Sequence, residues 1–173
     1  DLDNVVQRDS QLGWLRKHKR ALPKTEIEKI KINRAIRNHN PFNLNYTTIK
    51  WEGKLPMDKK IEKRFERFDS PLMGMRAVII NTLTHHIEYG DDTITKLITR
   101  HAPPKENDTK AFIKKVARDM GLDPNKKINL KDSYILSQYV EAVVDHEGFN
   151  HYFGTALLID EAIDLAYKQK NIP

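Results

Sequence analysis

The sequence predicts a mainly α-helical α+β domain that carries one small antiparallel sheet near its start. Two patterns support this fold class. A short stretch that begins at residue 42 alternates apolar and polar side chains, and the chain after Asp69 repeats apolar residues every three or four positions. Of the 173 residues, 39% are apolar, which is enough for the core of one ordinary domain. We therefore expect one globular domain with an N-terminal arm.

The arm is expected to span residues 1–32, and the globular domain residues 33–173. Apolar residues are sparse in the arm, and the basic run at 16–20 is too charged to be buried. Between residues 16 and 37, nine Lys and Arg stand against two Glu, which leaves a net charge of +7. The simpler interpretation is a solvated basic arm. The alternative is a contact with DNA, another polyanion or a neighbouring subunit.

The expected sheet lies at the start of the globular domain. Residues 42–46 place Phe, Leu and Tyr in alternation with two Asn residues, which is the period of a half-buried strand. A second short strand is expected at 49–51, before the turn at Gly53, and a third at 65–68. Strands this few and this short predict only a small antiparallel sheet.

Five helices are expected after Asp69. The first begins at Ser70, whose side chain is a capping group and which is followed by Pro71, a residue that suits the first helical turn. Gly90 closes this helix. The same apolar spacing, bounded by caps, Gly or Pro, predicts further helices at 93–101, 109–121, 132–146 and 156–168.

Several classes of functional site are excluded by composition and spacing. The chain has no Cys, which excludes disulfides, thiolate zinc sites and thiol nucleophiles. His146 and His151 are five residues apart, whereas the helical zinc motif needs four, so we expect no metal and no other cofactor. No stretch has the roughly 18 apolar residues that a membrane span requires, and we expect neither a span nor a signal peptide.

Glu147 is the strongest catalytic candidate that remains. It follows an apolar helix and precedes the aromatic residues Phe149, Tyr152 and Phe153. The negative end of the helix and apolar neighbours both disfavour ionisation, so we expect a raised pKa. A carboxyl group that keeps its proton near neutral pH is what cleavage of a glycosidic bond needs. The alternative interpretation is a solvated Glu at a helix end.

Six motifs extend through most of the chain after residue 36. They are Arg37-Asn38-His39-Asn40-Pro41-Phe42-Asn43-Leu44, Trp51-Glu52-Gly53, Phe65–Phe68 with Asp69-Ser70, Gly74-Met75-Arg76-Ala77, Ala102–Thr109 and His146-Glu147-Gly148. In this order the chain resembles a phage-associated family of small virion or cell-wall-lysing proteins, which begin with an Arg-Asn-Asn-Asn-Pro-Gly-Asn-Ile-like segment. It differs at His39, Phe42 and His101, where that family usually has Asn, Gly and Trp.

The resemblance implies a lysozyme-like helical domain that processes peptidoglycan. Related glucosaminidases and lytic transglycosylases place the Glu-bearing helix before the Asn-rich segment, whereas here Glu147 follows that segment. We therefore hypothesise a circular permutation. It requires Glu147 to face the segment from Asn40 to Trp51 across a groove. Glu147 would then be the general acid of a muramidase or lytic transglycosylase.

Candidate substrate contacts follow from the same resemblance. Asn40, Asn43 and Tyr46 are expected to bind acetamido groups, and Trp51 or Tyr152 to stack on a sugar face. Core packing is the alternative role for the aromatic residues. If the reaction uses a second carboxylate, the candidates are Glu52, Asp69 and Glu106.

Three functions remain open at this point. The first is a glycosidase of a phage or phage-derived particle, which is associated with the virion, acts on the cell wall and has glycan strands as its partner. The second is a virion structural or adaptor protein without activity, whose basic arm contacts DNA or neighbouring subunits. The third is a nucleic-acid-binding module, although the basic residues accompany no recognisable reading helix or aromatic platform.

Overall fold

The structure is a computed structural model that describes residues 33–149 and 154–173. The described part is mainly helical, which confirms the helical character of the expected fold. Its helices are α3 (Arg34–Arg37), α4 (Pro71–Glu88), α5 (Ile94–His101), α6 (Thr109–Met120), α7 (Ser133–His146) and α8 (Thr155–Gln169). The expected arm at 1–32 and the candidate residue Tyr152 lie outside the described residues.

The starts of the helices follow from local capping. The side chain of Ser70 accepts a hydrogen bond from the backbone N–H of Met73, and Thr93 and Asp132 cap α5 and α7 in the same way. α6 differs in one detail from the sequence pattern, which predicts Thr109 as its cap. Asp108 caps the helix, and the Thr109 hydroxyl instead donates a hydrogen bond to the carbonyl of Ala102.

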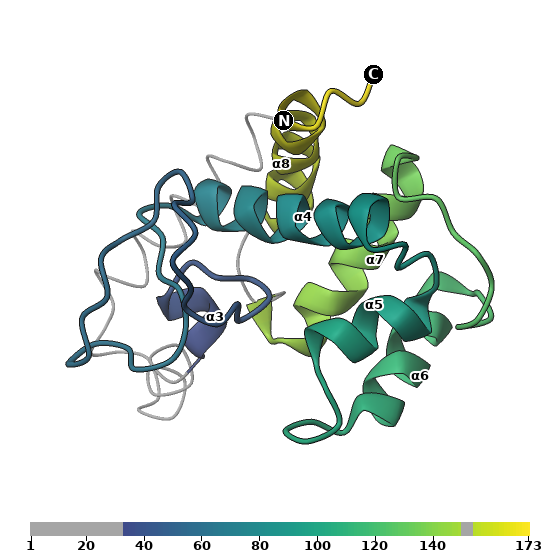
Figure 1. Cartoon of the computed structure of the whole chain (residues 1–173), viewed down its shortest axis with the longest axis horizontal. Coiled ribbons are helices and arrows are strands. Elements are labelled where there is room, and N and C mark those ends of the chain that lie inside the picture. Colours follow the sequence, from purple (N-terminus) through teal and green to yellow (C-terminus); the bar gives the residue numbers. More distant parts are fainter. Residues whose placement is uncertain (1–32, 150–153) are drawn as a thin grey trace, which may run out of the picture.

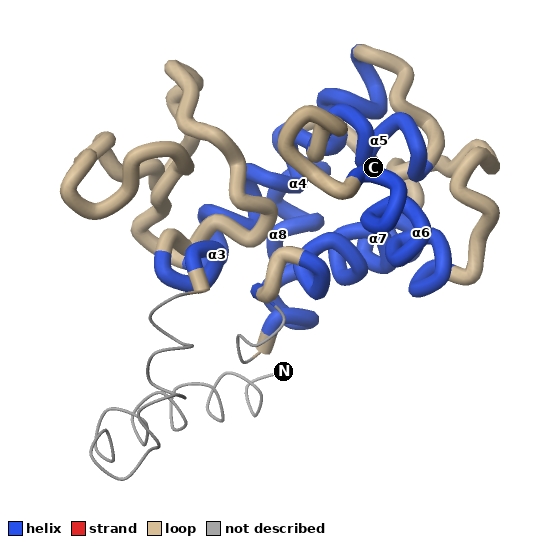
Figure 2. Tube along the Cα trace, turned by 90° about the horizontal axis from the view of Figure 1, so that it is seen from below, coloured by secondary structure: helices blue, strands red, loops and turns tan. Residues whose placement is uncertain are grey.

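α4 extends along the whole domain and connects its two halves (Figure 1). Helices α5 and α6 lie below its C-terminal half, and α7 runs from beside the C-terminal end of α4 down toward α3. The short helix α3 and the loops of residues 38–69 lie below its N-terminal half, and Figure 2 shows the same division from below. α4 packs mainly against α8, and α7 packs against both α6 and α8. The C-terminal end of α7 therefore reaches the loop half, where it meets α3.

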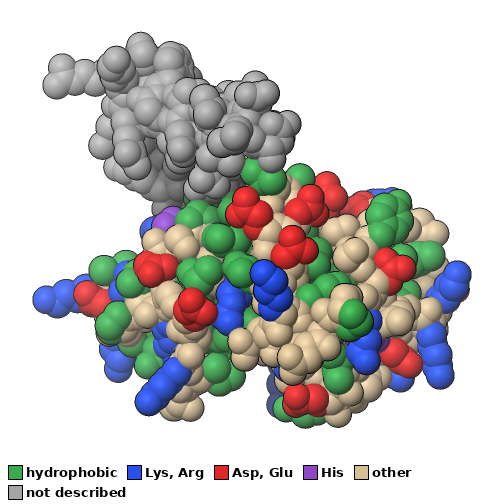
Figure 3. All heavy atoms as spheres, turned by 90° about the horizontal axis from the view of Figure 1, so that it is seen from above, with side chains coloured by type: hydrophobic (Ala, Val, Ile, Leu, Met, Phe, Trp, Pro, Cys, Tyr) green, Lys and Arg blue, Asp and Glu red, His purple; other side chains and the backbone are tan. Residues whose placement is uncertain are grey.

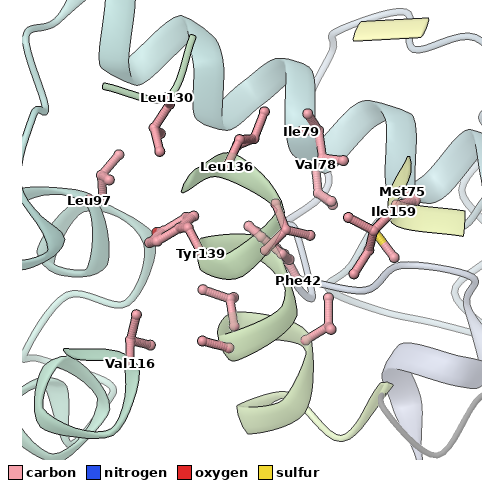
Figure 4. Packing of buried hydrophobic residues seen from close by; sticks show 14 of the residues in the cluster. Phe42, Met75, Val78, Ile79, Leu97, Val116, Leu130, Leu136, Tyr139 and Ile159 are labelled. Atoms are coloured by element: carbon pink, nitrogen blue, oxygen red, sulfur yellow. The ribbon is translucent and has the colours of Figure 1, made fainter. Parts of the chain in front are cut away.

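The core lies between α4, α8 and the helices α5, α6 and α7. On α7, Leu136, Tyr139, Val140 and Val143 recur at helical spacing, and all four are buried. Figure 4 shows side chains from α4, α5 and α7 directed into one common interior. Phe42, from the loop half, reaches the same core. The core therefore fixes the loop half relative to α7.

The expected small sheet does not form in the described residues. Two isolated antiparallel bridges replace it, Asn45 with Phe65 and Lys54 with Phe68. Asn43 has a φ of 51°, in the left-handed region, so the chain turns where a strand would have to continue. The expectation was wrong because alternating side chains do not show that one residue in the series leaves the extended conformation.

Glu62 holds the loop half together from inside. One of its carboxylate oxygens accepts hydrogen bonds from the backbone N–H groups of Lys63 and Arg64, both at 3.0 Å, and the other accepts from the Asn38 amide at 2.9 Å. Burial raises the pKa of Glu62, but the Asn38 and backbone hydrogen bonds and the charge of Arg34 outweigh it and lower the pKa to about 2.

We expect Glu62→Gln to lower the free energy of unfolding by about 1–2 kcal/mol at neutral pH, because the buried donors lose a charged acceptor. A lowered pKa in the folded state stabilises the fold above pH 4.5, and this contribution is lost as the pH falls toward about 2. Urea unfolding at several pH values measures both effects. A difference between the two proteins that stays constant down to pH 2 would contradict this role for the charge.

The described surface is mixed in charge. On the face seen in Figure 3, acidic and basic side chains are interspersed, so no large area of one sign stands out there. Within residues 33–149 and 154–173, no helix combines the length and the apolar character that crossing a membrane would require.

Candidate active site

Two adjoining hollows lie between the loop half and the helices. The first has a volume of about 270 Å³ and includes Glu147, and the second has a volume of about 200 Å³ and includes Trp51. Both are lined by Phe42, Asn43, Asn45 and His101. Because they share these residues, we describe the two together as one groove.

Glu147 lies at the end of α7, where the helix stops at Gly148. Gly148 has a φ of 82°, which favours glycine, and its carbonyl accepts a hydrogen bond from the Asn33 amide at 2.7 Å. The long apolar helix therefore ends against the loop half. This stop brings the side chain of Glu147, which is only 19% exposed, to the wall of the first hollow.

Both carboxylate oxygens of Glu147 are held by side chains from distant parts of the chain. The amide nitrogen of Asn43 donates to Oε2 at 2.8 Å, and Nε2 of His101 lies 3.2 Å from Oε1. Asn43 belongs to the loop that follows α3, and His101 is the last residue of α5. The carboxyl group is therefore fixed at the wall of the first hollow, by two residues that line both hollows.

Two phenylalanine rings restrain the imidazole of His101. The edge-on centroid distances are 5.3 Å to Phe42 and 5.8 Å to Phe112. The ring of His146 stacks on the ring of Phe112, with 3.7 Å between the ring centroids. Burial lowers the pKa of His146, although the charge of Glu147 opposes this effect. Two histidines thus lie close to one carboxylate, and one of them contacts it directly.

The expected rise in the pKa of Glu147 is wrong for the described structure. Burial does raise this pKa, but the hydrogen bonds from His101 and Asn43, together with the charge of His101, outweigh it and hold the pKa below its usual range. Glu147 is therefore a carboxylate at neutral pH. The sequence suggested apolar neighbours and a helix end, but it did not show that two donors would converge on the carboxyl group.

Of the other residues expected to contact substrate, some line the groove and others do not. Asn43 and Trp51 line the groove, and Trp51 also packs against the core. Asn40 is fully buried, and its side chain bonds to the backbone of Leu44 and Glu66. Asn40 therefore shapes the loop and has no free group for a substrate. Tyr46 is 41% exposed and lines neither hollow, because its ring lies under Lys54.

The three candidates for a second carboxylate are also separated. Glu106 lines the same hollow as Glu147 and forms an ion pair with Arg64. Glu52 is largely exposed and pairs with Arg76, and Asp69 is exposed; neither residue lines the two hollows. Of the three, Glu106 is thus the candidate that shares a hollow with Glu147.

His101 is the principal site residue that sequence reasoning missed. The sequence offered one signal, because His stands at position 101 where the resembled family usually has Trp. Nothing in the sequence connected His101 to the carboxyl group of Glu147, 46 residues away. In the part of the chain that the structure describes, no three side chains of His, Asp or Glu gather closely enough to hold a metal ion.

Comparison with known proteins places this arrangement in a phage context. No protein-family model matches the chain. The chain is 35% identical over 123 residues to Protein P5 of Pseudoalteromonas phage PM2, a match that covers 69% of this chain and 74% of Protein P5.

Proposed function

This chain belongs to the family of Protein P5 of Pseudoalteromonas phage PM2, and we propose that it cleaves the glycan strands of bacterial peptidoglycan. In this proposal Glu147 transfers the proton to the glycosidic oxygen. The protein would be associated with the virion and would act on the cell wall. The lysozyme-like fold and its circular permutation are parts of the same proposal.

One observation carries the proposal: a single, mostly buried carboxyl group lies in the wall of a groove, beside an Asn from the motif segment. The hydrogen bond of 2.8 Å between Asn43 and Glu147 supports the proposal by bringing Glu147 beside this segment, although the two residues touch directly and do not face each other across the groove. General acids of glycosidic cleavage are carboxyl groups in such partly desolvated positions. The groove continues past Glu147 to Trp51, whose ring suits stacking on a sugar face.

The reaction needs only one carboxyl group in its simplest form. Glu147 protonates the leaving oxygen as the bond to the anomeric carbon breaks. The hydroxyl on C6 of the same sugar then attacks the anomeric carbon and gives its proton to Glu147. This attack closes a second ring and forms an anhydro sugar. In the hydrolytic form, water attacks instead, and a second carboxylate can activate it.

A digestion experiment tests the proposal. The full chain is incubated with purified peptidoglycan from about pH 4 to about pH 8, and the soluble fragments are identified by mass spectrometry. We expect muropeptides cut between N-acetylmuramic acid and N-acetylglucosamine, and the products distinguish anhydro ends from reducing ends. If no fragments were released at any pH, the proposal would be rejected.

Glu106→Gln tests whether a second carboxylate takes part. We expect the variant to keep activity within about fivefold of the unaltered chain, because an exposed carboxylate paired with Arg64 adds little to the one-carboxylate route. Glu52→Gln is the matched control outside the groove. A loss of 100-fold or more in Glu106→Gln alone, on the order of a general-base contribution, would instead assign hydrolysis with Glu106 as the base.

The second candidate function is a virion structural or adaptor protein without activity. The lowered pKa of Glu147 favours it, because a carboxyl group that is ionised at neutral pH is a poor proton donor. DNA or a neighbouring subunit would then be the partner. Retention of DNA by the full chain that weakens steeply with salt, together with no wall digestion, would favour this function.

A further inference from the structure

The contact between His101 and Glu147 lies inside the proposed catalytic groove. The two side chains are 13% and 19% exposed. Phe42 and Phe112 flank the imidazole, and Asn43 binds the second carboxylate oxygen. Neither group can leave the other without loss of these contacts. The pair is therefore preorganised for proton transfer between Nε2 of His101 and Oε1 of Glu147.

Such a pair can hold one proton in two arrangements. With the proton on the imidazole, the pair is an ion pair. With the proton on the carboxyl group, both partners are neutral and Nε2 becomes the acceptor. The total charge is the same in both arrangements, so a substrate that displaces water from the groove favours the neutral one by desolvation.

Resting on the proposed function, we propose that His101 holds the proton that Glu147 delivers to the leaving oxygen. In the first step the proton moves from Nε2 to the carboxyl group and from there to the glycosidic oxygen, while the bond to the anomeric carbon breaks. The proton of the attacking sugar hydroxyl, or of water, then returns through Glu147 to His101. The pair ends each cycle with the one proton with which it began.

The other charged groups near the pair are engaged elsewhere or are poorly suited to this role. Among the described residues they are His85 on α4, whose pKa burial lowers, His146 and Asp145 on α7, Lys115 on α6, Arg100 on α5, and Arg34, Arg64 and Glu106 around the first hollow. Lys115 bonds to Asp145, Arg100 to Asp91 and Arg64 to Glu106. Burial favours the neutral form of His146. Within the described residues, His101 is the histidine whose ring nitrogen contacts the carboxylate of Glu147 directly.

Two substitutions at His101 distinguish proton holding from simple support. His101→Gln keeps a donor for the carboxylate but cannot hold the proton. We expect its wall-cleaving activity to fall off at a pH about one unit or more below that of the unaltered chain, because Glu147 must then hold the proton itself, and a carboxyl group loses its proton at a lower pH than an imidazole. In His101→Phe the donor is lost while burial remains, so the pKa of Glu147 should rise and activity should extend to higher pH than in His101→Gln.

A second measurement does not depend on activity. NMR of the full chain with ¹³C-labelled Glu carboxyl groups should show the Glu147 titration moving to higher pH in His101→Phe, and moving less in His101→Gln. The control is His86→Gln, since His86 contacts the backbone near Asp91 and Leu130 and lies outside the groove. We expect this variant to leave the pH dependence of cleavage unchanged.

The outcomes separate this inference from the proposed function. Absence of cleavage by the unaltered chain at every pH would reject the proposed function and, with it, proton delivery. Cleavage that falls off at the same pH in the unaltered chain and in His101→Gln would overturn the role of His101 alone. An unchanged Glu147 titration in His101→Phe would also overturn it. A uniform loss of kcat without a shift in pH dependence would identify His101 as structural support.

Discussion

Replacement of Glu147 by Gln is expected to reduce peptidoglycan cleavage by about 10²–10⁴-fold, which is the usual contribution of a positioned acid or base. Gln has the same size and can still accept a hydrogen bond from Asn43, so the groove should keep its shape. The amide cannot carry the proton to the leaving oxygen. Release of soluble fragments from purified cell walls measures the loss, and thermal unfolding confirms that the variant folds.

Glu141→Gln is the matched control for this experiment. Glu141 lies on the same helix, α7, and is exposed to solvent. Its replacement removes the same charge without touching the groove, and it should leave cleavage unchanged. Equal clearing by Glu147→Gln and by the unaltered chain would remove Glu147 from the mechanism. Equal losses in both variants would point to net charge and wall binding as the cause.

The second large effect is expected at Gly74, in the first turn of α4. A Cβ atom at this position would overlap the backbone carbonyl of His39 and come close to Phe68. The absence of a side chain lets α4 pack directly against the loop that leads to Asn43. We expect Gly74→Ala to lower the free energy of unfolding by about 3 kcal/mol, because the backbone must separate to admit the methyl group.

Urea unfolding measures this change, with Gly90→Ala as the control. At Gly90 a Cβ atom would meet nothing within 4 Å, so that substitution costs only the strain of a positive φ, about 1 kcal/mol. Helix propensity alone predicts the opposite sign for Gly74→Ala, since Ala is the better helix former by about 1 kcal/mol. If Gly74→Ala were as stable as the unaltered chain, the loop at His39 would not pack closely against α4.

The helices were predictable because their signals are local. The side chains of Ser70, Thr93 and Asp132 cap the backbone N–H of residues two or three positions ahead, and Gly121, with a φ of 66°, ends α6 as expected. The expected sheet failed for a related reason. The pattern at 42–46 reports which side chains are apolar, but the left-handed conformation of Asn43 depends on contacts that the pattern does not contain.

The candidate site could be predicted only in part. Glu147 was identifiable because its neighbours in the sequence are enough to place it. They show that it lies at a helix end, before aromatic residues and within a family-like motif. Its contact with the motif segment could be hypothesised only through the resemblance. Asn40 belonged to the same motif, yet the structure buries it and commits its amide to the backbone.

The sequence by itself determined that this is a mainly helical domain and that a carboxyl group ends its fourth long helix, since short-range capping and periodicity specify both. Only the tertiary structure decided whether that carboxyl group carries a proton. Its two donors, Asn43 and His101, come from 104 and 46 residues away. Ionisation depends on distances of a few ångströms to charges and donors, and the chain brings these groups together only when the core positions α5, α7 and the loop half against one another.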